Sequence, residues 1–425
     1  MERNDNMKNI LEELKWRGLI YDIINEEELE KRLQEPITLY CGFDPTADSL
    51  HIGSLLPIVT LMRFHQAGHR IIALTGGGTG LIGDPSGKKN ERQMNQEETV
   101  FSWAELFKKQ FARFLPFDDE TAFSLDNYQW LGEMKAIDMW REYGKHFNIN
   151  YMLAKDSVKS RLDNGLSYLE FSYMIMQSID FLKMYQDNKL HCEMQIGGQD
   201  QWGNITAGME LIRKVAGSDA KVFGLTLPLI TKSDGTKFGK TESGAVWLDE
   251  EKTSPYEMYQ FFINTADADV IPFLKYYTFL NKDEIASLEE KVQKEPHLRE
   301  AQKTLAKEVV KLVHGKQGLE NAMKLTEALF SGNIQSLNVQ EIKMCFNDVA
   351  FIETKDDMGL LDALTALQAA SSKREGREFI KNGAISVNGI QVRDLEFVVR
   401  KDEAIGKEFS VIRRGKKNYY LIKHQ

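Results

Sequence analysis

The sequence has 425 residues, of which 42% are hydrophobic, and a formal net charge of −9. This length predicts two or three domains, and the apolar content argues against a disordered chain. The sequence contains no signal-peptide core, no membrane-spanning apolar run, and no cysteine spacing typical of disulfide frameworks or zinc sites, so we expect a cytoplasmic protein without a membrane partner.

The charge is unevenly distributed along the chain. Residues 371–425 carry 13 Lys and Arg against 7 Asp and Glu, a net of +6, so the other 370 residues carry −15. A basic end on an acidic body indicates a local contact with a polyanion, although a solvated charged face fits the same composition.

Residues 38–54 follow an amphipathic helix predicted at 8–18 and read as a buried strand, a turn and the start of a second helix. Asp48 or Ser49 is expected to cap that second helix. Its first turn offers free backbone N–H groups that attract an anion, close to His51 and Gly53. The segment therefore suits nucleotide binding at the edge of a parallel sheet, the alternative being an ordinary turn with a capping histidine.

Residues 70–76 predict a second buried parallel strand, which runs into a glycine-rich loop. Gly78, Gly80 and Gly83 match the spacing of a dinucleotide-binding fingerprint, but the Asp-Pro-Ser-Gly run at 84–87 disfavours the helix that this fingerprint requires. The loop also lacks the glycine and Ser/Thr spacing of a Walker A motif. We interpret it as a loop open to close backbone approach, followed by one carboxylate and a basic tail: Asp84, Lys88, Lys89 and Arg92.

Residues 97–165 predict helices separated by short loops, with aromatic side chains in the core. Residues 168–185 predict a helix that is buried on most sides. Tyr173, Gln177 and Asp180 recur at i, i+4 and i+7 and therefore share one of its faces. Because unpaired buried polar groups cost roughly 1–3 kcal/mol each, this stripe indicates a polar ligand, with a solvent-facing stripe as the alternative.

Residues 190–204 predict another strand, a Gly-Gly turn and a helix start, which should face the 38–54 segment across the switch-point crevice of the sheet. Residues 225–242 predict the end of a strand and a basic loop suited to closing over phosphates. Residues 248–330 predict helices with breaks near Asn264 and Gly315. Residues 331–358 are weakly patterned, and residues 359–425 predict a small module that ends in a strand, a basic turn and a strand.

Five of these segments together resemble the signatures of bacterial tyrosyl-tRNA synthetases, a family of class I aminoacyl-tRNA synthetases. In the family's order, they are Tyr-Cys-Gly-Phe-Asp-Pro-Thr-Ala-Asp-Ser-Leu-His-Ile-Gly at 40–53, the glycine loop at 76–92, the helix at 168–185, the segment 190–204, and Lys-Phe-Gly-Lys-Thr at 237–241. The resemblance implies an α/β protein: a Rossmann-like parallel-sheet catalytic domain, then an α-helical domain and a small α+β RNA-binding C-terminal module.

The domain limits that the resemblance implies cover the whole chain. They are a catalytic domain at 1–228, with an insertion at about 118–165 that forms a homodimer interface; a mobile basic signature loop and link at 229–247; an α-helical anticodon-side domain at 248–330; a linker at 331–358; and an RNA-binding module at 359–425.

The implied reaction is that of a tyrosine–tRNA ligase. ATP activates L-tyrosine to tyrosyl-adenylate and pyrophosphate, and the tyrosyl group then passes to the 3′ end of tRNA(Tyr). The residues implied to bind tyrosine are Tyr40 and Asp180 at the phenol hydroxyl, Asp84, Tyr173 and Gln177 at the ammonium, and Gln195 and Gln201 at the carboxylate. Those implied to bind ATP are Cys41, Gly42, Asp44, Gly53, Ser54, Gly197, Gly198 and Asp200.

The reaction needs no acid–base dyad, because the tyrosine carboxylate is already a nucleophile and pyrophosphate is a good leaving group. Orientation and charge near the developing anion then do the catalysis. We assign this role to Thr46, His51, Lys88, Arg92, Lys237, Lys240 and Thr241. Mg²⁺ is expected to arrive on the ATP phosphates, with no protein metal site. Ser54 replaces the His or Asn that usually ends the first signature, which predicts weaker contacts to the transition state of activation.

The candidate tRNA-phosphate contacts lie in the C-terminal module: Arg374, Arg377, Lys381, Arg413, Arg414, Lys416 and Lys417. Two other functions fit the resemblance. One is a catalytically weak, synthetase-like RNA-binding protein, and the other is an enzyme that charges a modified tyrosine. The retained His51, Asp84, Lys237 and Lys240 favour the active tyrosine enzyme.

Overall fold

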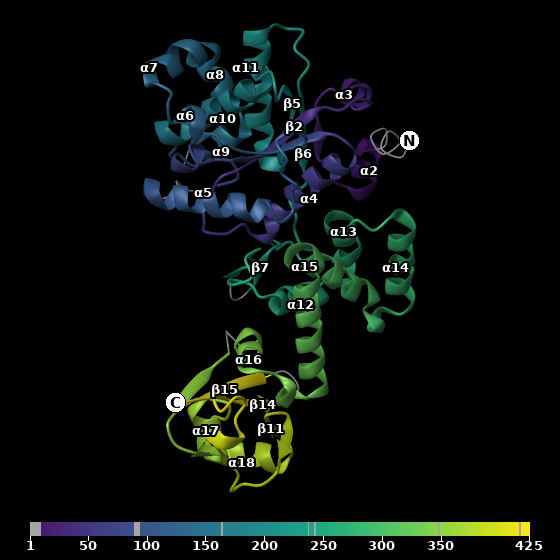
Figure 1. The fold of residues 1–425 in the computed structure, drawn as a ribbon, viewed down its shortest axis with the longest axis vertical. Coiled ribbons are helices and arrows are strands. Elements are labelled where there is room, and N and C mark those ends of the chain that lie inside the picture. The colour runs from purple at the N-terminus through teal and green to yellow at the C-terminus, as the bar shows by residue number, and fades with distance from the viewer. Residues whose placement is uncertain are drawn as a thin grey trace. The chain divides into compact units, whose positions relative to one another are not determined.

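The computed structural model describes residues 10–88, 94–162, 165–236, 238–241, 244–346, 349–415 and 418–425, without the side chains of 157, 240 and 241 (Figure 1). The chain forms two compact units. Unit 1 holds the described residues up to Lys252 together with Thr265–Leu305, and unit 2 holds Thr253–Asn264 with Ala306–Gln425.

Unit 1 is organised around a six-stranded sheet of order β1-β6-β5-β2-β3-β4. The strands are parallel except for the short edge strand β1. The chain passes from β2 outward through β3 to β4, then returns to β5 on the other side of β2, so the strand order reverses between β2 and β5. The strands are β1 Asp22–Ile23, β2 Thr38–Phe43, β3 Arg70–Thr75, β4 Ala122–Asp126, β5 Cys192–Gly198 and β6 Phe223–Leu227.

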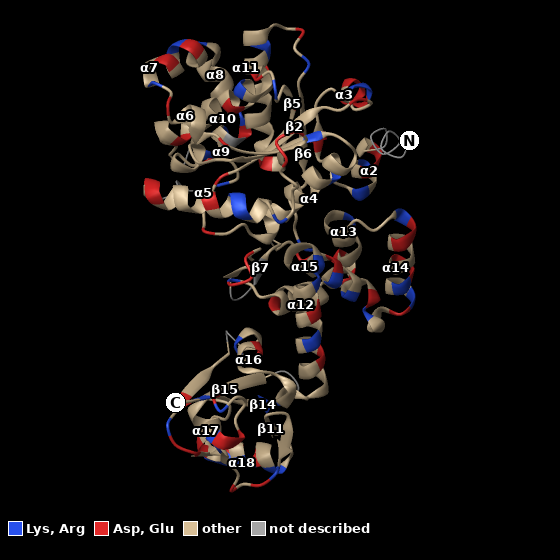
Figure 2. Ribbon diagram, viewed as in Figure 1, with Lys and Arg blue, Asp and Glu red and all other residues tan. Residues whose placement is uncertain are grey.

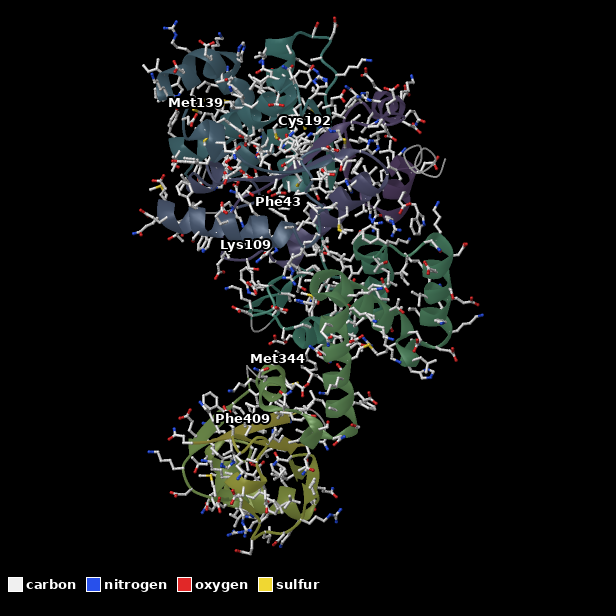
Figure 3. All side chains as sticks on the ribbon, in the orientation of Figure 1. Phe43, Lys109, Met139, Cys192, Met344 and Phe409 are labelled. Carbon is white, nitrogen blue, oxygen red and sulfur yellow. The ribbon has the colours of Figure 1, made fainter. Side chains whose placement is uncertain are left out.

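Helices cover both faces of this sheet, with α4 and α5 on one side and α10 and α11 on the other (Figure 1). Because both faces are covered, the central strands are apolar throughout, and Ile71, Ile72 and Leu74 are almost fully buried. Figure 3 labels Cys192, a buried residue of the central strand β5. The helices of this part are α2 Ile10–Arg17, α3 Glu26–Arg32, α4 Ile52–Gln66, α5 Glu97–Phe111, α6 Tyr128–Leu131, α7 Ala136–Asp138, α8 Ile149–Leu153, α9 Asp156–Leu162, α10 Tyr168–Gln186 and α11 Trp202–Ala216, with short helical turns η1 Thr79–Leu81, η2 Met139–Tyr143, η3 Gly144–His146 and η4 Gln199–Gln201.

The remaining elements of unit 1 follow the sheet. They are the small hairpin β7 Lys240–Thr241 and β8 Gly244–Ala245, the helices α13 Asp267–Tyr277 and α14 Lys282–Lys294, the turn η5 Pro296–Leu298, and the start of α15 Glu300–Ser331. α15 continues into unit 2 and is interrupted at Gly315, where φ is 72°. α12 Pro255–Ile263 ends at the cap Asn264, so both predicted helix breaks are confirmed. Among the described helices, none combines the length and the apolarity needed to cross a bilayer.

Unit 2 contains a five-stranded sheet of order β12-β11-β14-β15-β9 and the helices of the C-terminal module. Phe409, labelled in Figure 3, begins β14 and is buried. The final strand–turn–strand prediction is confirmed by β14 and β15. The elements after α15 are η6 Ile334–Ser336, α16 Val339–Cys345, β9 Phe351–Thr354, β10 Met358–Gly359, α17 Leu360–Ala366, α18 Lys373–Lys381, β11 Ile385–Val387, β12 Ile390–Val392, β13 Val398–Val399, η7 Lys401–Glu403, β14 Phe409–Arg414 and β15 Asn418–His424.

Three expectations about local structure were wrong. β4 lies within 97–165, where we expected only helices and loops. The cap of α4 is His51 rather than Asp48 or Ser49, because the Asp48 carboxylate pairs with Lys252 and the Ser49 hydroxyl donates to a backbone carbonyl. Residues 331–358, expected to be a linker, contain α16 and β9 instead.

The folding of 331–358 has a clear cause in its packing. Asn338 and Glu341 form a reciprocal capping box that starts α16, and Ile342 is fully buried in a cluster with residues of α15 and β14. β9 pairs in parallel with β15. The sheet of the C-terminal module therefore begins at Phe351, before the boundary that its sequence pattern indicated.

Candidate active site

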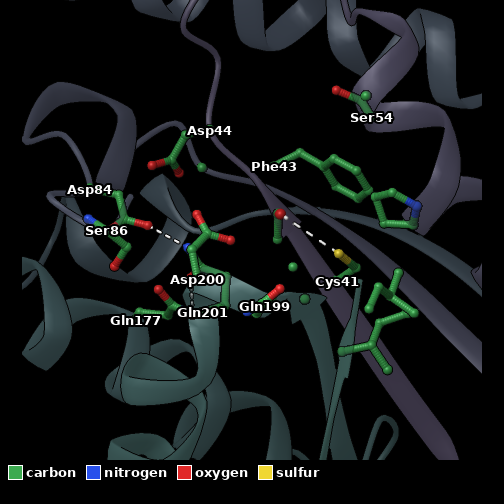
Figure 4. A pocket seen from close by; sticks show the side chains of 18 of the residues that line it. Cys41, Phe43, Asp44, Ser54, Asp84, Ser86, Gln177, Gln199, Asp200 and Gln201 are labelled. Atoms are coloured by element: carbon green, nitrogen blue, oxygen red, sulfur yellow. Dashed lines mark hydrogen bonds between the residues drawn. The ribbon is translucent and has the colours of Figure 1, made fainter. Parts of the chain in front are cut away.

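A cavity of about 450 Å³ opens at the carboxyl ends of β2 and β5, where the strand order reverses. This is the position at which open α/β sheets bind ligands. Its lining comes from the 38–54 segment, the glycine loop, α10 and the segment that starts at β5. In Figure 4, Asp44, Asp84, Gln177, Asp200 and Gln201 gather on one side, and Cys41 and Ser54 lie on the other.

Apart from Lys240 and Thr241, of which only the backbone is described, every described residue that we predicted to bind tyrosine or ATP, or to catalyse activation, lines this one cavity. These residues are Tyr40, Cys41, Gly42, Asp44, Thr46, His51, Gly53, Ser54, Asp84, Lys88, Tyr173, Gln177, Asp180, Gln195, Gly197, Gly198, Asp200 and Gln201. Arg92, Lys237 and the side chains of Lys240 and Thr241 lie outside the described part of the chain.

Asp180 and Tyr40 form the buried polar end of the cavity, with exposed fractions of only 2% and 1%. Asn127 Nδ2 donates to one carboxyl oxygen of Asp180 at 2.9 Å, and the Trp130 indole N–H donates to the other at 2.7 Å. Burial raises the pKa of Asp180 to about 8, against the effect of these two donors. Burial, with the nearby Asp180, also raises the pKa of the Tyr40 phenol. Among the residues that the structure describes, the Tyr40 hydroxyl has no hydrogen-bond partner.

A second polar group lies around Asp84. Its Oδ1 accepts from the Ser86 backbone N–H at 2.8 Å, and its Oδ2 accepts from Gln201 Nε2 at 2.6 Å, the latter drawn in Figure 4. Gln201 Oε1 in turn accepts from Gln177 Nε2 at 3.2 Å. One carboxylate and several amide oxygens thus converge in a small region, which suits a cationic ligand group.

Asp44 and Thr79 join the two ends of the cavity. The Tyr173 hydroxyl donates to Asp44 at 2.7 Å, and the Thr79 hydroxyl donates to the other Asp44 oxygen at 2.7 Å. Thr79 also accepts from Asn127 Nδ2 at 2.9 Å, and that amide holds Asp180. A continuous chain of hydrogen bonds therefore runs from Asp180 to Tyr173, and it fixes the orientation of every side chain along it.

Within the described part of the chain, three buried polar atoms of the lining have no partner: the Tyr40 hydroxyl and the side-chain carbonyl oxygens of Gln177 and Gln195. Such atoms are rare in folded proteins, because each costs about 1–3 kcal/mol when it is left unpaired. Their concentration in one cavity indicates a polar ligand that supplies the missing hydrogen bonds.

His51 occupies the start of α4 and faces the opposite part of the cavity. Its Nδ1 accepts from the Gly53 backbone N–H at 3.0 Å, so its Nε2 carries the proton when the ring is neutral. Burial and the charge of Lys88 lower the pKa of His51. Because Nδ1 accepts a hydrogen bond at the cap, the neutral ring presents its Nε2–H as a donor, and the role of His51 at the developing charge stays a prediction. A side chain at Gly53 would lie 2.8 Å from the His51 ring, so the glycine allows this close approach.

Sequence analysis missed Asn127, Trp130 and Thr79, which orient the predicted residues. Asn127 directly follows β4, and polar residues at the carboxyl end of a parallel strand face the ligand crevice. The signal was available but depended on recognising β4, and Trp130 had been assigned to the core with the other aromatic residues of its region.

The predicted tRNA contacts lie in unit 2. Arg374, Arg377 and Lys381 are exposed on α18, and their recurrence at i, i+3 and i+7 places them on one face. Figure 2 colours the Lys and Arg positions of the ribbon blue. Arg413 is half-buried. Arg414 is partly occupied within the module, since it donates to the Ala369 carbonyl and lies 5.4 Å from the centre of the Phe379 ring. Lys416 and Lys417 are outside the described residues.

Comparison with known proteins agrees with this geometry. Residues 31–331 match the family model of class I tRNA synthetases (W and Y), and residues 341–422 match that of the tyrosine–tRNA ligase SYY-like C-terminal domain. Tyrosine–tRNA ligase 1 of Bacillus subtilis (strain 168) is 54% identical over 424 residues, which are 99% of this chain and 100% of the relative. The Geobacillus stearothermophilus tyrosine–tRNA ligase is 55% identical over 420 residues, 98% of this chain and 100% of the relative.

A solved structure supports the same family assignment. The C-terminally truncated mitochondrial tyrosyl-tRNA synthetase of Aspergillus nidulans superposes with a TM-score of 0.67 at 30% identity, covering 77% of this chain and 98% of that one. Both family models, the full-length relatives and this structure agree. The chain belongs to the tyrosyl-tRNA synthetases of the class I aminoacyl-tRNA synthetase family.

Proposed function

We propose that this protein is a tyrosine–tRNA ligase that forms tyrosyl-adenylate from L-tyrosine and ATP and then transfers the tyrosyl group to the 3′ end of tRNA(Tyr). The observation that carries this proposal is the buried end of the cavity, where the Asp180 carboxyl and the Tyr40 hydroxyl, which has no partner among the described residues, lie among apolar side chains. A phenol side chain fits this end, because its ring is apolar and its hydroxyl both donates and accepts a hydrogen bond.

The rest of the cavity supports the remaining contacts to tyrosine. Asp84, Tyr173 and Gln177 bind the ammonium, for which the carboxylate and the free Gln177 oxygen are suitable acceptors. Gln195 and Gln201 orient the carboxylate that attacks the α-phosphate. Held in this way, the nucleophile approaches the phosphate in one orientation, which is the main source of the rate enhancement.

The nucleotide occupies the part of the cavity lined by the first turn of α4 and by the glycines that end β5. MgATP is the substrate, with the metal held by the phosphates. Cys41 and Asp200 contact the ribose. The close approach of the nucleotide to the protein is allowed or supported by Gly42, Asp44, Gly53, Gly197 and Gly198. The charge that develops on the phosphates is stabilised by Thr46, His51, Lys88, Arg92, Lys237, Lys240 and Thr241. Ser54 reaches less far than a His or Asn, so we expect weaker stabilisation from that position.

A tRNA substrate accounts for the basic face of α18. Replacing Arg374, Arg377 and Lys381 together by alanine should raise the KM for tRNA and lower the slope of log K against log salt by about 2–3. The rate of tyrosyl-adenylate formation should not change, because the face does not line the cavity.

Lys373 on the same helix provides the matched control, since its ammonium pairs with Asp362 at 2.5 Å, whereas the Arg374–Glu378 pair is 4.0 Å apart. Lys373→Ala should leave the salt slope near that of the unchanged protein. Equal effects of the triple and the control variant on tRNA binding would contradict the assignment of this face.

We also propose a homodimer that forms through the insertion at about 118–165. Several large apolar side chains there are exposed, including Ile137 (63%), Trp140 (51%) and Ile149 (61%). Exposed apolar side chains clustered in one segment are typical of an interface. Sedimentation of the unchanged protein tests this state. The free cysteines Cys41, Cys192 and Cys345 support a reducing, cytoplasmic location.

Pyrophosphate exchange into ATP, measured with tyrosine, phenylalanine and a ring-substituted tyrosine, tests the proposed reaction. We expect exchange that depends on tyrosine, followed by charging of tRNA(Tyr). Preference for the substituted amino acid would indicate a modified tyrosine as the true substrate. Absence of exchange with all three, together with retained tRNA binding, would instead favour a synthetase-like RNA-binding protein.

A further inference from the structure

One wall of the cavity comes from the segment between β6 and β7. We call its described residues, 228–236 and 238–239, the wall loop. Leu229, Ile230 and Phe238 of this loop line the cavity. Within the loop, the backbone hydrogen bonds are Lys232 N–H to Thr236 O at 2.9 Å, Gly235 N–H to Lys232 O at 2.9 Å and a long one from Phe238 N–H to Ile230 O at 3.4 Å. Such a short turn needs outside support to hold one position.

Helix α13 supplies that support at two points. The Asp269 carboxylate accepts from the Ser233 backbone N–H at 2.9 Å and from the Ser233 hydroxyl at 3.2 Å. The Phe238 ring packs against Phe273 and Tyr277, with centroids 4.6 and 5.6 Å away. Asp269, Phe273 and Tyr277 follow one another at intervals of four residues, so one buried face of α13 makes all these contacts.

The end of α13 is in turn fixed to the helix that begins the nucleotide site. Arg63 of α4 and Arg17 of α2 are buried, and both donate to carbonyl groups just after the last turn of α13. Arg63 Nη2 lies 2.5 Å from Thr278 O, and Arg17 Nη2 lies 2.7 Å from Leu280 O. Cations at a helix C-terminus also interact favourably with the helix dipole. The support of the wall loop is thereby tied to α4, the helix whose first turn lines the cavity.

We propose that the Asp269–Phe273–Tyr277 face of α13 positions the wall loop for the activation step, with Asp269 as the principal positioning residue. The inference rests on the proposed function, because it concerns the rate of adenylate formation. Asp269 does not line the cavity and acts through Ser233 and the loop. Without its carboxylate, the loop loses two hydrogen bonds at its tip and keeps the Phe238 packing on α13, so the wall on the nucleotide side is held less firmly. The tyrosine end, built from β2 and α10, keeps its own contacts.

Asp269→Ala tests this inference, with Asp267→Ala as the matched control. Asp267 lies on the same helix and accepts a hydrogen bond from Gln302 on α15, but it makes no hydrogen bond to the wall loop. In single-turnover assays of adenylate formation, Asp269→Ala should lower kcat/KM for ATP by about tenfold or more, since small displacements of a reacting geometry have large effects on rate. Tyrosine affinity, measured at equilibrium, should stay within about twofold, and Asp269→Asn, which retains an acceptor for Ser233, should recover part of the loss.

The outcomes separate this inference from the proposed function. The inference alone is overturned if the unchanged protein activates tyrosine normally and the Asp269→Ala variant activates it at the same rate. The inference is also overturned if Asp269→Ala lowers tyrosine affinity by the same factor as kcat/KM for ATP, because that result indicates general destabilisation. Absence of tyrosine-dependent adenylate formation in the unchanged protein overturns the proposed function, and this inference with it.

Discussion

Replacing Asp180 by alanine is expected to lower kcat/KM for tyrosine activation by about a hundredfold, since a phenol hydroxyl buried without its acceptor costs about 1–3 kcal/mol. The preference for tyrosine over phenylalanine should fall in parallel. Phenylalanine has no hydroxyl, so its activation does not depend on this acceptor. Pyrophosphate exchange with both amino acids measures the effect.

Tyr40→Phe is the companion variant. The Tyr40 hydroxyl has no partner in the parts of the chain that the structure describes, so removing it should reduce the same preference without lowering the melting temperature. Asp180→Ala should also destabilise the fold, because the Trp130 N–H loses its acceptor and the Asn127 side-chain amide loses one of its two acceptors. An unchanged tyrosine preference in both variants would rule out this end of the cavity as the phenol site.

The destabilisation caused by Asp180→Ala should depend on pH. The carboxyl has a pKa of about 8 in the folded protein, against about 4 when unfolded. Between these values the folded state binds more protons, so this group makes the parent protein less stable as pH rises. The variant lacks the group, and its deficit in melting temperature should therefore shrink from about pH 4 to about pH 8. A deficit that grows with pH would mean that the pKa of Asp180 is depressed instead.

Gly76→Ala should lower tyrosine activation by about a hundredfold, because a displacement of about 1 Å in a reacting site can have that effect. Gly76 follows β3, and an added Cβ would lie 2.0 Å from Asp44 Oδ1 and 2.5 Å from the Thr79 hydroxyl. These atoms form the middle of the hydrogen-bond chain from Asp180 to Tyr173. The methyl group must displace the Asp44 carboxylate, and Tyr173 then loses the group that orients it.

Gly144→Ala controls for the general effect of adding a methyl group to a glycine. Its Cβ would meet no atom closer than 3.7 Å, so activation should be unchanged. Steady-state exchange and thermal unfolding of both variants separate lost activity from lost folding. If Gly76→Ala retained parent activity, the chain through Asp44 and Thr79 would have no role in the reaction.

Much of the candidate site followed from local sequence. The strand–turn–helix pattern at 38–54 and its counterpart at 190–204 depend on residues that are neighbours along the chain, and both lie where expected. The stripe of Tyr173, Gln177 and Asp180 needed only the helical period, and all three residues point into the cavity. The resemblance of these segments to one enzyme family then linked them to a common ligand.

The errors have a common cause, which is that the relevant contacts join residues distant in sequence. Asn127 and Trp130 act on Asp180 across a separation of about fifty residues, and β4 gains its strand conformation from pairing with β3. Residues 331–358 have weak local patterns, yet Ile342 and Phe346 are buried against α15 and β14. Local propensity alone carries no information about such partners.

The sequence by itself determined the fold class, the order of the motifs and the polar stripe on the buried helix, because periodicity and turn chemistry are local properties of the chain. Only the tertiary structure decided which of these groups are satisfied and which are left for a ligand. It paired Asp180 with Asn127 and Trp130, left the Tyr40 hydroxyl without a partner among the described residues, and lowered the pKa of His51 through burial and the charge of Lys88. Hydrogen-bond satisfaction and pKa depend on burial and on neighbours in space, and the chain acquires both only when it packs.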